Sequence, residues 1–89
     1  MATYIISYDL NSPGQRYSEL HDEIKSLGAW WHHLTSTWLV DTTLSASQIR
    51  DRLKARVDAN DRILVLRAGA TWATFGMPKT ANDWLHQHI

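Results

Sequence analysis

Residues 3–10, TYIISYDL, are the stretch that decides how the rest of the chain can fold. Tyrosine and isoleucine are typical of β-strands, so we predict a strand from Thr3 to Leu10. Side chains of a strand alternate between two faces. The even-numbered positions are all apolar, whereas the other face runs from Ile5 through Ser7 to Asp9 and becomes polar. One face of this strand therefore belongs in a core, and the other ends in a carboxylate.

The rest of the chain alternates between strand and helix patterns. Gly28 follows apolar residues at helical spacing and predicts a helix end. Ser45 and Gln48 form a capping-box pattern that predicts a helix start. The expected elements after the first strand are a helix at 13–27, strands at 29–35 and 37–42, a helix from 45 to about 60, strands at 62–67 and 70–75, and a helical turn within 80–89.

This order predicts an α+β fold, a ferredoxin-like βαββαβ sandwich with an additional C-terminal strand, in a single domain covering residues 1–89. Both long helices need the apolar face of the first strand to pack on. Ser7 and Asp9 then lie on the uncovered face of the sheet. An open face that also holds Ile5 and some of the tryptophans favours a partner, so we expect a homodimer.

Composition excludes several classes of protein. The 89 residues are 44% hydrophobic and include five tryptophans, which is enough for a core and argues against disorder. The chain has no cysteine, which excludes disulfides and thiolate chemistry. Nine basic and nine acidic residues balance, unlike a highly basic nucleic-acid-binding protein. No apolar run is long enough to span a membrane and no signal peptide is visible, so we expect a cytoplasmic protein.

Three features in this order resemble the CRISPR-associated protein 2 superfamily, which includes the virulence-associated protein D ribonucleases. They are an apolar first strand ending in Tyr8-Asp9, the segment Leu44–Gln48 opening the second helix, and Asp61–Val65 at the start of the fourth strand. The chain is most similar to short relatives described as SinR-like. The resemblance covers roughly residues 3 to 75. The Trp30–His33 segment and the tryptophan in the fifth predicted strand depart from the CRISPR proteins.

The resemblance implies a ferredoxin-like homodimer in which the fifth strand adds to the partner's sheet. It further implies a metal-dependent endonuclease of RNA or DNA, in which each subunit supplies the aspartate that ends the first strand; the matching residue is Asp9. Such proteins belong to phage defence, mobile elements or toxin–antitoxin systems. Other members are non-catalytic scaffolds, so a dimeric scaffold or a module that binds protein or nucleic acid is the alternative. Dimeric α+β barrel oxygenases share the topology, but the sequence offers no motif for their enclosed pocket.

Asp9 also has a physical case as a catalytic and metal-binding residue. Two copies near a two-fold axis would place two carboxylates around one Mg²⁺, an ion that prefers oxygen ligands. The metal would lower the pKa of a bound water and offset phosphate charge during hydrolysis. The alternative is structural, because an aspartate that ends a strand often caps the following turn, here Asn11–Gly14.

Basic residues suggest where a nucleic-acid backbone could lie. Arg16 follows the strand end that carries Asp9 and could contact a phosphate, or it could pair with Glu19. Arg50 and Lys54 belong to a locally basic second helix that could track the backbone. The alternative is charge matching with the acidic first helix, which should lie alongside, or a solvated surface.

The histidines and tryptophans leave two questions open. Neighbouring strand residues face opposite ways, so His32 and His33 cannot bind one metal together, but His33 could act as a general acid or base. Trp30 and Trp72, like the other strand tryptophans, could stack on unpaired bases or fill a core and an interface. The sequence predicts no organic cofactor site.

Overall fold

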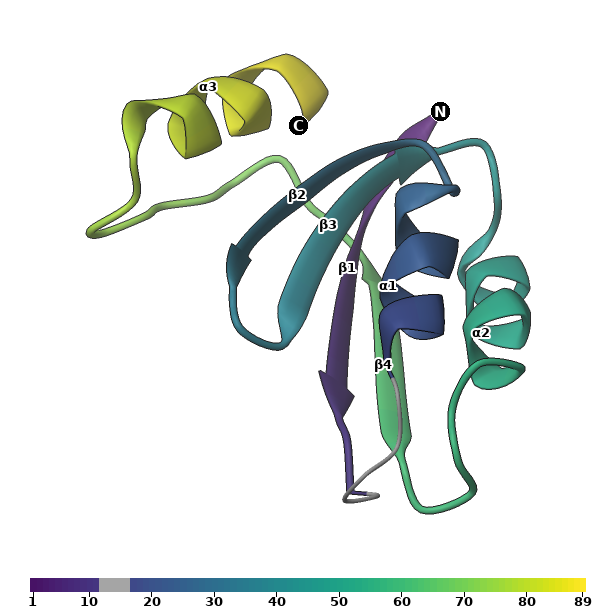
Figure 1. Ribbon diagram of the computed structural model, residues 1–89. Coiled ribbons are helices and arrows are strands. Elements are labelled where there is room, and N and C mark those ends of the chain that lie inside the picture. Colours follow the sequence, from purple (N-terminus) through teal and green to yellow (C-terminus); the bar gives the residue numbers. More distant parts are fainter. Residues whose placement is uncertain (12–16) are drawn as a thin grey trace.

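Strand β1 (Ala2–Asp9) lies inside a four-stranded antiparallel sheet of order β2-β3-β1-β4 in the computed structural model, which describes residues 1–11 and 17–89 (Figure 1). The chain is thus an α+β protein, as expected. The other elements of the described residues are α1 (Ser18–Lys25), β2 (Ala29–Leu34), β3 (Thr37–Thr42), α2 (Ala46–Lys54), β4 (Arg62–Arg67) and α3 (Lys79–His88).

The register of the sheet confirms the predicted alternation along β1. Ile6 pairs with Trp38 of β3 and with Val65 of β4, on the face that α1 and α2 cover. On the opposite face, Ser7 pairs with Leu64. Since residues 4–7 of β1 have neighbours on both β3 and β4, the two faces of this strand set the character of the whole sheet.

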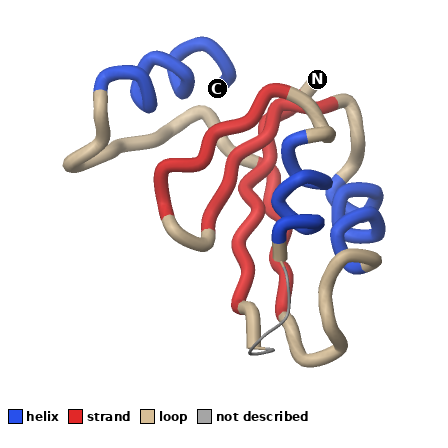
Figure 2. Tube along the Cα trace, in the orientation of Figure 1, coloured by secondary structure: helices blue, strands red, loops and turns tan. Residues whose placement is uncertain are grey.

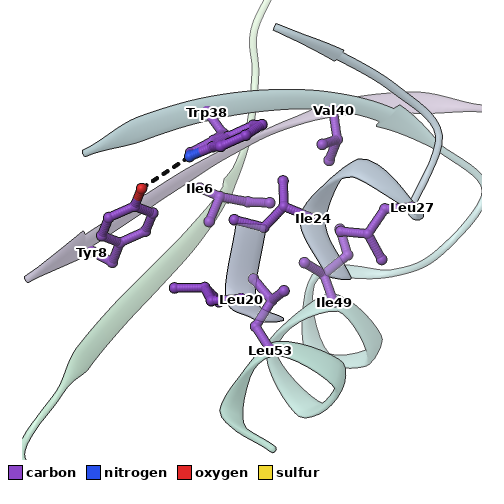
Figure 3. Close-up of a cluster of buried hydrophobic side chains, with 9 residues drawn as sticks. All are labelled: Ile6, Tyr8, Leu20, Ile24, Leu27, Trp38, Val40, Ile49 and Leu53. Atoms are coloured by element: carbon purple, nitrogen blue, oxygen red, sulfur yellow. Dashed lines mark hydrogen bonds between the residues drawn. The ribbon is translucent and has the colours of Figure 1, made fainter. Parts of the chain in front are cut away.

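The main core lies between the sheet and helices α1 and α2 (Figure 3). Its nine buried side chains are Ile6, Tyr8, Leu20, Ile24, Leu27, Trp38, Val40, Ile49 and Leu53. The Trp38 indole Nε1 donates a hydrogen bond of 3.0 Å to the Tyr8 hydroxyl, so the one polar atom of this buried indole has a partner. Burial of this apolar surface is the main source of stability for the two-layer unit.

The start of α1 and the start of β2 are each set by a local feature of the sequence. Tyr17 is the N-terminal cap residue of α1, and the part of the predicted helix at 13–16 lies outside the described residues. At the other end, a Cβ on Gly28 would collide with the backbone carbonyl oxygen of Asp41. Glycine is therefore required where β2 begins to run beside β3.

Helix α2 begins as predicted and ends early. The Ser45 hydroxyl accepts a hydrogen bond from the Gln48 backbone N–H, and the Gln48 side chain accepts one from the Ser45 N–H, which completes the capping box. The helix ends at Lys54 rather than near Asn60. The Asp61 carboxylate accepts from the Asp58 N–H, and such side-chain contacts favour a turn over further helix.

The predicted strand at 70–75 is wrong for the single chain. After β4 the chain leaves the sheet and crosses to the face opposite α1 and α2, with no strand between Arg67 and α3 (Figure 2). Trp72 and Met77 pack against a second cluster of buried residues on that face. Their burial draws the segment over the sheet instead of along the free edge of β4.

Helix α3 covers part of the face that we expected to be open, and it is longer than the expected turn (Figure 1). The second buried cluster joins Trp31 and Leu39 of the sheet to Ala81 and Leu85 of α3. The Trp31 Nε1 donates to the Ala81 carbonyl oxygen at 3.2 Å. None of the helices in the described part of the chain has the length and apolar character needed to cross a membrane.

The C-terminal end of α3 is fixed to the sheet by polar contacts. The Thr3 hydroxyl donates to the His88 carbonyl oxygen at 2.6 Å, and the His88 Nδ1 lies 2.7 Å from the Asp41 Oδ2. The Trp84 ring stacks on the His88 ring with centroids 4.1 Å apart. Trp84 therefore anchors the C-terminus.

We expect Leu53→Ala to lower the free energy of unfolding by about 2–5 kcal/mol, because Leu53 is fully buried and the change leaves a cavity. The matched change Leu34→Ala removes a side chain that is 46% exposed and should cost less than about 1 kcal/mol. Urea denaturation followed by tryptophan fluorescence measures both. Equal decreases in the free energy of unfolding for the two variants would contradict the placement of Leu53 in the main core.

Candidate functional site at the end of strand β1

Asp9 is the last residue of β1 and stands clear of the rest of the sheet. The last pair between β1 and β3 is Ser7 with Thr37, so Asp9 has a strand neighbour only on β4, where it pairs with Arg62. Asp9 is exposed. Its carboxylate forms no hydrogen bond or ion pair within residues 1–11 and 17–89, and it is accessible to a ligand. Capping by Asp9 of the turn at 11–14 falls largely on residues outside that range.

A shallow hollow of about 220 Å³ surrounds this carboxylate, and it is lined by Ser7, Tyr8, Asp9, Arg62, Ile63 and Leu64. Arg62 is not among the site residues that we predicted from the sequence. Only the antiparallel register with β1 places its guanidinium group on the face of Asp9, since Arg62 is 53 positions away along the chain. A carboxylate beside a guanidinium offers one group that attracts a cation and one that attracts a phosphate.

The chain after Asp9 is tied to the start of β4 by Asp61. This carboxylate accepts hydrogen bonds from the Asn11 backbone N–H at 2.7 Å and from the Tyr17 hydroxyl at 2.8 Å. Partial desolvation acts to raise the pKa of Asp61, but the hydrogen bonds from Asn11, Asp58 and Tyr17 outweigh it and hold that pKa below its usual range. Asp61 thus has a structural role. The Asp9 carboxylate makes no such hydrogen bonds within the described residues.

Two exposed leucines continue the surface that carries Asp9. Leu64 and Leu66 of β4 are 54% and 50% exposed, and they pair with Ser7 and Ile5 of β1. We call Ser7, Asp9, Arg62, Leu64 and Leu66 the open strip. We expected the whole of this face to be uncovered. The 68–77 segment and α3 cover one part of it, and the open strip is the part beside them that remains exposed.

The structure does not bring the predicted nucleic-acid-binding residues together with Asp9. Arg16 lies outside the described residues. Arg50 and Lys54 project from α2 and line a hollow of about 380 Å³ on the helix-covered side of β4. Arg50 also forms an ion pair with Asp51 at 2.9 Å, although both side chains are more than half exposed and the pair contributes little.

Two basic residues on and just after α2, Arg52 and Arg56, confirm the charge-matching alternative. Arg52 and Arg56 bind the Glu23 carboxylate of α1 at 2.7 Å and 3.2 Å. The hydrogen bond from Arg52 is the main reason that the pKa of Glu23 lies below its usual value. Half of the basic side chains on and just after α2 therefore hold the two helices together, and the surface left for a polyanion is small.

The two neighbouring histidines face different environments. The His32 ring stacks on Trp38 at 3.7 Å between centroids, on the side of the main core. The exposed His33 ring packs against Trp31, 5.0 Å between centroids, on the opposite side of the sheet. His33 thus shares a face with Asp9, but it comes from β2, two strands away, and has no contact with Asp9.

Two of the strand tryptophans are packed in a core, which was one of the two roles predicted for them. Trp31 and Trp38 are 4% and 1% exposed, so neither can stack on a base. Trp30 is 43% exposed and lies beneath the Lys25 ammonium, 5.1 Å from its ring centroid. These residues enlarge the two cores of a small chain.

His21 lies at the end of a row of hydrogen-bonded side chains beside the main core. The Tyr8 hydroxyl accepts a hydrogen bond from the Trp38 Nε1 and lies within hydrogen-bond distance, 3.2 Å, of the His21 Nε2. Burial is the main cause that lowers the pKa of His21, and the nearby His32 and Lys25 lower it further against the opposing effect of Asp22. The site therefore disfavours a charged imidazole.

No family model matches the chain, and no solved structure matches it. Within the described residues, no three histidine, aspartate or glutamate side chains converge as a metal site would require. The residues of one chain thus fit a magnesium ion only in part, through the accessible Asp9 carboxylate, and a second copy or a substrate would have to supply further oxygens.

The contribution of His21 to the free energy of unfolding should increase as the pH rises to about 6.5. The reason is that the unfolded state binds the His21 proton more tightly than the folded state does. His21→Gln keeps an acceptor for Tyr8 and removes the titration, so its free energy of unfolding should depend less on pH below that value. His33→Gln is the matched control and should keep the wild-type dependence. Urea titrations at several pH values measure all three, and identical curves for His21→Gln and the wild type would refute the assignment.

Proposed function

We propose that the chain is a ferredoxin-like homodimer that cleaves RNA or DNA with the help of Mg²⁺, resembling endonucleases of the CRISPR-associated protein 2 superfamily. The observation that carries the proposal is the Asp9 carboxylate, which is exposed, has no partner among the described residues and stands at the end of β1, an inner strand of the sheet. A phage-defence, mobile-element or toxin–antitoxin setting follows from the same resemblance.

The sheet supports the ferredoxin-like assignment. In a βαββαβ chain of that type, the two strand–helix–strand halves interleave, and both helices cover one face. The order β2-β3-β1-β4 with antiparallel neighbours, and the packing of α1 and α2 on one core, agree with this arrangement.

The open strip supports a dimer through the same face. Leu64 and Leu66 are large exposed apolar residues next to each other on one face of an edge strand, a combination that favours a partner. A two-fold axis through the open strip would bring the same residues of both copies together. It would place the two Asp9 carboxylates near each other, and one ion could then hold oxygens from both chains.

In the proposed cleavage reaction, each of these residues would have a separate role. The paired Asp9 carboxylates would hold Mg²⁺, which supplies an activated water and offsets phosphate charge when bound. Arg62 stands beside each Asp9 and would contact a phosphate oxygen of the substrate. Lys54 and Arg50 lie on the helix-covered side of β4 and would contact the nucleic-acid backbone farther from the cleaved bond, where it passes around this edge strand. His33 has no contact that would make it the acid or base.

The alternative is a non-catalytic dimeric scaffold or binding module of the same fold. The balance of nine basic and nine acidic residues favours it, as does the use of Arg52 and Arg56 within the chain. Such a protein would bind a partner through the open strip without turnover. A nucleic-acid complex of this kind would weaken steeply as salt is raised.

We expect Asp9→Ala to lower the rate of Mg²⁺-dependent cleavage of RNA or DNA by at least about 100-fold, the scale typical for loss of a catalytic group. The matched control Asp83→Ala removes a half-exposed carboxylate of α3 that pairs with Lys79 and should keep the wild-type rate. Cleavage of labelled single-stranded RNA and DNA, with Mg²⁺ or with a chelator, measures the rates.

Equal cleavage by Asp9→Ala and the wild type would sink the nuclease proposal, because the activity would then come from a contaminant. A wild-type protein without any cleavage, but with a salt-sensitive nucleic-acid complex, would support the scaffold instead. Size measurements on each variant separate loss of the dimer from loss of the carboxylate.

A further inference from the structure

A hollow of about 340 Å³ lies on the opposite side of the sheet from α1 and α2, away from Asp9. Its floor is formed by Ile5, Trp31 and Leu39, and its far wall by Leu85 of α3. The 68–77 segment forms the roof. The volume falls within the range of about 300–1,000 Å³ that is common for small-molecule sites.

The chemistry of the lining indicates what such a site would take. No residue that lines the hollow carries a charged or titratable side chain. The Thr74 hydroxyl already donates to Asn82, and the Thr37 hydroxyl lies 3.4 Å from that of Ser7. The Thr71 hydroxyl is the remaining side-chain hydroxyl of the lining, so water in the hollow would find few of the partners it needs. The lining is therefore complementary to an uncharged and largely apolar molecule.

One indole ring, that of Trp72, gives the hollow a preference for flat ligands. Trp31 is 4% exposed and forms part of the closed floor beneath it. Trp72 is held edge-on against the His86 ring, with centroids 5.0 Å apart. Aromatic rings held in fixed orientations favour stacked or edge-to-face contact with another aromatic ring.

We propose that this hollow binds a small, uncharged, flat aromatic molecule, at a site separate from Asp9. A second copy of the chain is the competing occupant, because Phe75 stands at the rim and is 99% exposed. The hollow favours the small molecule, since the 68–77 roof and α3 enclose it on two sides. It also shares no residue with the open strip.

The test uses 1-aminoanthracene, an uncharged three-ring fluorophore at neutral pH. We expect saturable binding of one probe per chain, with a rise in probe fluorescence. Ala73→Leu and Thr71→Leu each place a larger side chain at the roof of the hollow and should weaken binding by about ten-fold or more. Ala70→Leu, in the same segment but outside the lining, is the matched control and should bind as the wild type does. Thermal unfolding of each variant checks that it is folded.

Absence of saturable binding to the wild type would overturn the proposal. It would also be overturned if folded Ala73→Leu and Thr71→Leu both bound as tightly as Ala70→Leu, because the probe would then lie elsewhere. If Phe75→Ala converts a dimer to a monomer and only that monomer binds the probe, the hollow is filled by a second copy and the proposal is wrong. None of these results depends on nuclease activity, so the two proposals fail separately.

Discussion

The two faces of β1 are the constraint on which the rest of the structure depends. The strand has hydrogen-bonded neighbours on both sides, so its alternation extends across the sheet. One face, centred on the fully buried Ile6, accepts α1 and α2 and forms the main core. The other face starts apolar at Ile5 and ends polar at Asp9. Its apolar end is covered by α3 and the chain before it, and only the polar end stays open.

This division explains why two neighbouring aspartates differ in character. Asp61 is committed to backbone and tyrosine hydrogen bonds that join the β1 exit to β4, and those contacts lower its pKa. Asp9 lies on the adjacent strand with no such contacts. The Asp9 carboxylate can bind an external ligand without first breaking a hydrogen bond to the described residues. The guanidinium group of Arg62, opposite it on β4, is suited to binding a phosphate. The exposed Leu64 beside them links the candidate site to the proposed interface.

Much of the fold could be predicted from the sequence, because its signals are local. Periodicity gave the β3 and β4 bounds, and the Ser45–Gln48 capping box gave the start of α2. The errors came from tertiary contacts. The segment 70–75 has strand composition, yet packing of Trp72 on the far face prevents it from joining the sheet of its own chain. Asp9 could be proposed from its position, but Arg62 required the strand register, which no local pattern reveals.

In the proposed dimer, the open strip is the interface between two copies of the chain. Sedimentation equilibrium of the wild type and of Leu64→Asp tests it most directly, with Lys54→Asp as a control on the other side of β4. We expect a wild-type mass of two chains, a mass of one chain for Leu64→Asp, and a dimer for the control, because a buried unpaired carboxylate at the interface is costly. A wild-type protein that remains a monomer at high concentration, or a Leu64→Asp variant that stays dimeric, would contradict it.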